Sequence, residues 1–123
     1  MNTFVAIGMD DLDSILGSGD GSPVLVFKHS PHCWTSIFAA QEIGRFQVAH
    51  PNIPIRLIDV LANRAVSQTV AERLGLRHPS PQAILLAGGQ VQWAASHQDI
   101  TEDGIARALV RLPAATGSSA TPA

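Results

Sequence analysis

The sequence predicts an α/β fold in which helices cover one mixed β-sheet. A continuous apolar run over 24–27 is typical of a strand that is buried on both faces. Strand-like and helical patterns then alternate up to residue 74, which favours parallel pairing of the first strands. Two further strand-like runs are separated only by Gly88-Gly89, which indicates an antiparallel hairpin. Together these patterns predict a sheet with both kinds of pairing.

The elements are expected in a definite order along the chain. A short amphipathic helix over 9–16 comes first, followed by a strand over 24–27, a helix from 33 to about 49 and a strand over 55–60. The next helix is capped by Asn63 and ended by Gly75. Strands over 82–87 and 90–95 follow, and then a helix that is capped by Thr101 and stopped by Pro113. This βαβαββα order is that of the thioredoxin fold. We therefore expect one thioredoxin-like domain over 1–112 with an extra N-terminal helix, followed by a flexible tail over 113–123.

Composition excludes several classes of function. The net charge of −2 and the scattered basic residues argue against nucleic-acid binding. No apolar run approaches the roughly 20 residues that a membrane-spanning helix needs. The acidic start of the chain is unlike a signal peptide. A single cysteine excludes an internal disulfide and fits a reducing compartment, so we expect a cytoplasmic protein.

Cys33, the only cysteine, falls where a strand turns into a helix. The free N–H groups and partial positive charge of a helix N-terminus favour the reactive thiolate. A lone cysteine is otherwise often a small buried apolar residue. If Cys33 is reactive, its chemistry needs an external thiol or disulfide, because the chain has no second thiol.

Neighbouring residues give further candidates. Ser36 completes a Cys-x-x-Ser motif and could donate to the thiolate, or instead satisfy amides of the helix. His32 could stabilise the thiolate or relay a proton, and Trp34 could shape a groove for a partner or simply pack. A metal site at His29, His32 and Cys33 is not expected, since Pro31 stiffens the turn and no fourth ligand is near.

Ser80-Pro81 precedes the strand over 82–87. Most X–Pro bonds are trans, and only the fold assignment favours a cis bond here. A cis proline would leave a backbone edge near Cys33, where an extended substrate segment could pair.

Three motifs now carry a resemblance to a known family. They are Val26-Phe27-Lys28-His29-Ser30-x-x-Cys33-x-x-Ser36, Ser80-Pro81-Gln82-Ala83-Ile84-Leu85 and Ser96-His97-x-x-Ile100-Thr101. With the three motifs in this order, the chain resembles the monothiol bacilliredoxins, which are thioredoxin-fold proteins of the bacillithiol system. The resemblance covers roughly residues 10–112. It departs from them at Trp34-Thr35, where members usually carry Pro-Ile.

The resemblance implies a monothiol thiol–disulfide oxidoreductase. Cys33 would attack mixed disulfides between client proteins and bacillithiol or another low-molecular-weight thiol, assisted by Ser36. The resemblance also makes Pro81 the cis proline beside Cys33. With the candidates His32, Trp34 and Ser80 from the sequence itself, we expect Pro81 to contact the substrate. No bound cofactor is implied; the small thiol is a co-substrate, the partners are S-thiolated proteins, and the protein is expected to act as a monomer.

Two other functions remain open from the sequence. A non-catalytic thioredoxin-fold interaction module would have an ordinary thiol and no turnover. An iron–sulfur cluster carrier would join two chains through Cys33 of each and two external thiols.

Overall fold

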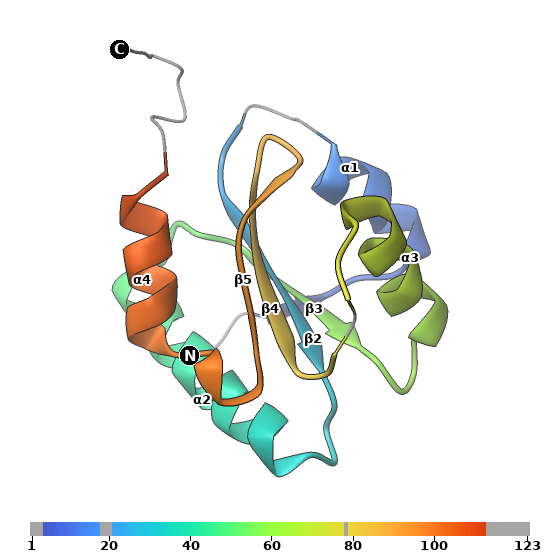
Figure 1. Cartoon of the computed structure of the whole chain (residues 1–123), viewed down its shortest axis with the longest axis horizontal. Helices are drawn as coiled ribbons and strands as arrows, with labels where there is room; N and C mark the ends of the chain where they lie inside the picture. Colours follow the sequence, from blue (N-terminus) through green and yellow to red (C-terminus); the bar gives the residue numbers. More distant parts are fainter. Residues whose placement is uncertain (1–3, 18–20, 78, 113–123) are drawn as a thin grey trace.

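The computed structural model describes residues 4–17, 21–77 and 79–112. Within these ranges a five-stranded sheet has the order β1-β3-β2-β4-β5 (Figure 1). The strands are β1 (Phe4–Ala6), β2 (Val24–His29), β3 (Ile55–Asp59), β4 (Gln82–Ala87) and β5 (Gln90–Ser96). The helices are α1 (Leu12–Leu16), α2 (Trp34–Ala49), α3 (Arg64–Leu74) and α4 (Glu102–Val110), with 3-10 turns η1 (Met9–Asp11) and η2 (His97–Asp99). The predicted thioredoxin-like α/β architecture is confirmed.

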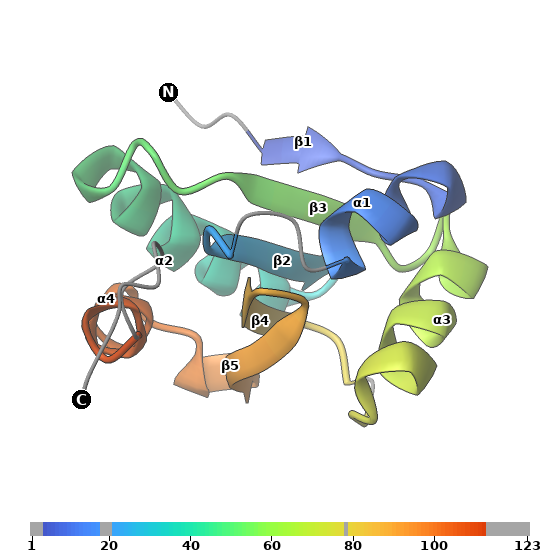
Figure 2. The same ribbon diagram turned by 90° about the horizontal axis from the view of Figure 1, so that it is seen from above.

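Helices cover both faces of the sheet. Figure 2 shows α2 and α4 on one side and α1 and α3 on the other. Residues 25–28 of β2 are all 0% exposed, and they alternate between the two layers. Leu25 and Phe27 belong to the apolar cluster under α2 and α4, whereas Val26 belongs to the cluster under α1 and α3. β2 is thus the strand buried on both faces that its apolar run predicted.

The sheet brings three strand ends together at one edge. β2 runs parallel to β3, with His29 opposite Asp59, and antiparallel to β4, with Lys28 opposite Gln82. The carboxyl ends of β2 and β3 and the start of β4 therefore meet. In open α/β sheets, ligands bind beyond such an edge.

Local turn chemistry explains the observed boundaries. Gly75 ends α3 in the left-handed region at φ 66°, and Thr101 caps α4 by accepting the N–H of Gly104. Gly88 and Gly89 join β4 to β5 with φ of 61° and 76°. At Gly89 a side chain would also meet the Leu16 carbonyl oxygen at 2.7 Å. These turn predictions are confirmed.

Some boundaries differ from the prediction. β1 was not predicted, because three residues carry no usable pattern and pair only where β3 presents an edge. The helix expected over 9–16 begins as the 3-10 turn η1. α4 ends at Val110, while the stop predicted at Pro113 and the tail over 113–123 lie outside the described residues. None of the described helices is long and apolar enough to cross a membrane.

Candidate active site

Cys33 is the N-cap residue of α2. Its N–H donates to the Ser30 carbonyl at 3.1 Å, and its own carbonyl accepts the N–H groups of Ser36 and Ile37 at 3.0 Å. The side chain is neither fully buried nor fully exposed. A thiol held in this way lies beside the amides of the first helical turn.

Hydrogen bonds lower the pKa of the Cys33 thiol below its ordinary value. The largest contribution is the hydroxyl of Thr35, whose Oγ1 lies 2.9 Å from Sγ. The backbone N–H groups of Ser36 and Thr35 add to it, and partial desolvation opposes it. These contacts stabilise the thiolate relative to an ordinary cysteine, as a nucleophile requires.

Replacing Thr35 by valine is expected to raise the Cys33 pKa, because the isosteric side chain cannot donate to the thiolate. Thr35→Ser keeps the hydroxyl and is the matched control. The ultraviolet absorbance of the thiolate against pH measures both, without interference because the chain has no tyrosine. Equal midpoints in Thr35→Val and the wild type would show that the helix amides act alone.

Ser36 is placed differently from the expectation. Its hydroxyl, buried at 0% exposure, accepts the Ser30 N–H at 2.9 Å and shares a hydrogen bond of 2.7 Å with His29 Nδ1. Burial lowers the pKa of His29, which favours a neutral ring. The hydroxyl thus fixes the turn before Cys33, and it is the main-chain N–H of Ser36 that acts on the thiol.

Replacing Ser36 by alanine is expected to lower the free energy of unfolding by about 1–3 kcal/mol, because the Ser30 N–H loses its acceptor. Ser14→Ala, at an exposed serine, is the control and should change stability little. Chemical denaturation measures both. An unchanged stability with a clearly raised Cys33 pKa would instead restore the direct role of the hydroxyl.

Ser80-Pro81 is a cis peptide bond. Pro81 comes just before Gln82, the partner of Lys28, so it lies beside the end of β2 from which the chain turns toward Cys33. The Pro81 carbonyl accepts the N–H of His97 at 3.2 Å. Within the described residues the main chain of Ser80 makes no hydrogen bond, so the available backbone edge is at Ser80, not at Pro81.

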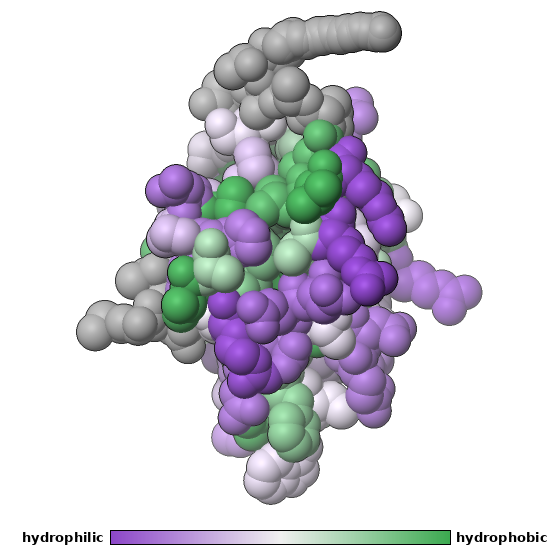
Figure 3. Space-filling model, turned by 90° about the vertical axis from the view of Figure 1, so that its left-hand side faces the viewer, coloured by the Kyte–Doolittle hydropathy of each residue, from purple (hydrophilic) through white to green (hydrophobic). Residues whose placement is uncertain are grey.

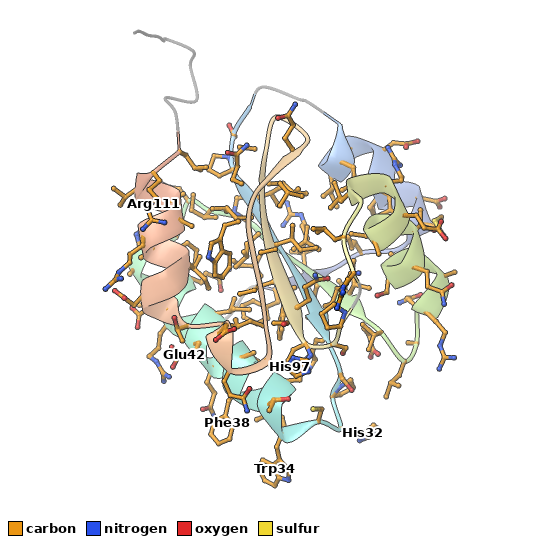
Figure 4. All side chains as sticks on the ribbon, in the orientation of Figure 1. His32, Trp34, Phe38, Glu42, His97 and Arg111 are labelled. Carbon is orange, nitrogen blue, oxygen red and sulfur yellow. The ribbon has the colours of Figure 1, made fainter. Side chains whose placement is uncertain are left out.

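Two aromatic side chains project from the first turns of α2. Trp34 is 75% and Phe38 61% exposed, and Figure 4 shows both pointing away from the body at the lower end of the molecule. Figure 3 shows a small hydrophobic area at this lower end, below a hydrophilic band. Beside it lies a groove of about 280 Å³ between α2 and η2, lined by Thr35, Phe38, Ala39, Glu42, His97, Gln98, Ile100 and Thr101. His32, also exposed, lies to the other side of Trp34 in Figure 4.

Comparisons with known proteins agree with this geometry. The family described as "Monothiol bacilliredoxin BrxC" matches residues 8–105. The chain belongs to the monothiol bacilliredoxin family. This membership brings with it a thiol redox function, in agreement with a free Cys33 whose pKa is lowered.

Solved structures support the fold of this bacilliredoxin. A thioredoxin-fold protein provisionally named as an oxidoreductase matches with a TM-score of 0.78 and 24% identity, over 85% of this chain and 92% of that one. A chain from a study of thiol resolution in yeast mitochondrial 1-Cys peroxiredoxin gives 0.69 and 11%, over 89% and 96%. Thioredoxin f2 of Chlamydomonas reinhardtii gives 0.66 and 10%, over 85% and 92%.

Sequence reasoning missed three features of the bacilliredoxin site. Thr35 was noted only as a departure from the family, although a hydroxyl two residues after an N-cap cysteine is within reach of its sulfur. Phe38 follows Trp34 by one helical turn, a spacing that signals a shared face. The His29–Ser36 hydrogen bond left no signal in the sequence.

No group of three potential metal ligands occurs in the described part of the chain.

Proposed function

We propose that this bacilliredoxin removes a low-molecular-weight thiol, bacillithiol in the first instance, from S-thiolated client proteins. The observation that carries the proposal is the isolated thiol of Cys33, partly exposed at a helix N-terminus with its pKa lowered by three hydrogen-bond donors. A single accessible thiolate is suited to exchange with a disulfide and to nothing that needs a second thiol.

In the first step the Cys33 thiolate attacks the sulfur of the small thiol within the mixed disulfide. A new disulfide joins Cys33 to the small thiol, and the old one breaks with its electron pair on the client sulfur. The client leaves as a thiolate and takes up a proton from water. Cys33 is thereby oxidised and the client cysteine reduced.

In the second step a free small thiol, as its thiolate, attacks the sulfur of the same small thiol held on Cys33. The Cys33 thiolate is released, and the two small thiols leave as their symmetrical disulfide. The hydrogen bonds from Thr35 that stabilise the anion also make Cys33 a good leaving group in this step. The oxidising equivalent passes to the pool of small thiol.

The client is proposed to dock on the surface formed by Trp34, Phe38 and the groove beside them. Exposed aromatic side chains beside a reactive thiol offer apolar contact area at a low cost in side-chain entropy. The main chain of Ser80, which makes no hydrogen bond to other described residues, would pair with an extended client segment across the site. We propose that the protein acts as a monomer in the cytoplasm, where a lone free thiol stays reduced.

The identity of the small thiol is tested with a client protein that has one cysteine. This cysteine is joined by a disulfide to bacillithiol, glutathione or free cysteine, here called the cap, and the rates of cap transfer to Cys33 are compared. Mass spectrometry should detect a Cys33 adduct whose added mass is that of the cap, and bacillithiol should give the fastest transfer. Adducts that contain the client would mean attack on the other sulfur. Complete absence of exchange with every cap would favour a non-catalytic interaction module.

A further inference from the structure

A second hollow lies at the same edge of the sheet as Cys33, on the side covered by α3. It measures about 280 Å³, and its lining comes from the β3–α3 connection, the first turns of α3 and the residue before the cis proline: Val60, Leu61, Arg64, Ser67, Gln68 and Ser80. The Val60 N–H donates to the His29 carbonyl at 3.0 Å, which ties this connection to the end of β2. Figure 1 shows the β2–α2 and β3–α3 connections at the same lower end of the molecule.

The hollow has one basic side chain, Arg64, in its lining and a second, Lys28, behind its wall. Arg64 forms no ion pair within the described residues, whereas Arg73 on the same helix pairs with Asp13 at 2.9 Å. Behind the wall, the fully buried Lys28 donates through Nζ to the Ser67 carbonyl at 2.9 Å, and it has no carboxylate partner in the part of the chain that the structure describes. The nearby Asp59 uses Oδ1 to accept the N–H groups of the turn that follows it. Within the described residues neither Arg64 nor Lys28 forms an ion pair with this carboxylate or with another.

Ser80 lines the hollow, and within the described residues its buried Oγ has no hydrogen-bond partner. A buried hydroxyl without a partner costs free energy, and such atoms are uncommon in folded proteins. A bound acceptor would satisfy it. Ser80 also precedes the start of β4, which pairs with the end of β2, the strand from which the chain turns toward Cys33.

We propose that this hollow binds a carboxylate of the small thiol that Cys33 exchanges. The planar Arg64 guanidinium suits a carboxylate, the Ser80 hydroxyl would donate to it, and Lys28 adds positive charge from behind. The inference rests on the proposed function, since it places the non-reacting end of the small thiol on the α3 side. The client would then extend from the main chain of Ser80 to the opposite side, at Trp34 and Phe38.

The test compares two caps on one client protein: bacillithiol, whose malic acid moiety carries carboxylates, and the same thiol with those carboxylates esterified. The rates of cap transfer to Cys33 are measured for the wild type, Arg64→Gln and the charge-matched control Arg73→Gln. We expect the wild type to favour the acid over the ester by roughly tenfold or more, as for a charge-assisted hydrogen bond. In Arg64→Gln the ratio of the transfer rate of the acid to that of the ester should fall toward one. In Arg73→Gln this ratio should stay as in the wild type.

The possible failures are distinct. Transfer of acid and ester at equal rates by the wild type would overturn the carboxylate site and leave de-thiolation standing. A wild-type preference that Arg64→Gln retains would also overturn it, because the preference would arise elsewhere. If neither cap is transferred while an uncharged small disulfide still modifies Cys33, the proposed function fails, and the carboxylate site fails with it.

Discussion

Replacing Cys33 by alanine is expected to reduce client de-thiolation to the rate observed without the protein. The chain has no other thiol, and a hydroxyl such as that of Ser36 is a far weaker nucleophile than a thiolate. Release of free client thiol, followed from a bacillithiol-capped protein in the presence of excess bacillithiol, measures the effect. The fold should persist, because Cys33 is not part of either apolar cluster.

Arg107→Gln is the matched control, since its side chain is exposed on α4 and pairs with Asp103, its one ion-pair partner among the described residues. It should turn over like the wild type. De-thiolation that survived in Cys33→Ala would mean that the observed activity belongs to the small thiol alone or to a contaminant, and the single-thiol mechanism would be wrong.

Raising the pH from about 8 to 10.5 is expected to increase the free energy of unfolding by about 3 kcal/mol through Lys28. Burial lowers the pKa of this lysine from 10.5 to about 8. Below pH 8 both folded and unfolded chains carry the proton, and the folded state bears the cost of a buried ammonium. Between the two pKa values only the unfolded chain keeps the proton, so stability rises with pH.

The contribution of Lys28 to the rise in the free energy of unfolding is measured by comparison with Lys28→Met. Methionine has a similar volume and cannot titrate. Lys28 is the only lysine and the chain has no tyrosine, so the remaining alkaline titrations are common to both proteins. Denaturant unfolding at several pH values gives the two curves. Parallel curves would contradict a lowered Lys28 pKa, whereas convergence toward high pH, from a variant more stable at neutral pH, agrees with it.

Most of the architecture follows from local patterns. The apolar run predicts β2, and apolar residues at helical spacing predict the helices. Gly75 predicts the end of α3, and Gly88 and Gly89 predict the turn between β4 and β5. β1 could not be predicted, because its pairing partner β3 lies some fifty residues away in sequence. The start of α2 at Trp34 was predicted to within one residue, since the helix was expected from Cys33, which is its N-cap.

The site was predictable in its nucleophile and less so in its supporting contacts. Cys33 and the cis bond at Ser80-Pro81 followed from the strand-to-helix turn and the fold. The orientation of Ser36 toward His29 and Ser30 depends on how the turn folds back, which spacing alone does not reveal. The hollow near Arg64 depends on β3, α3 and β4 meeting, a juxtaposition that exists only in the folded chain.

The measurement that tests the single-thiol mechanism most directly is a turnover experiment without free small thiol. The wild type, mixed with excess bacillithiol-capped client, should release one equivalent of client thiol and stop, with one cap on Cys33 by intact mass. Added bacillithiol should remove the cap and restart release. Continued turnover without added thiol, or release of client thiol without a cap on Cys33, would contradict the mechanism.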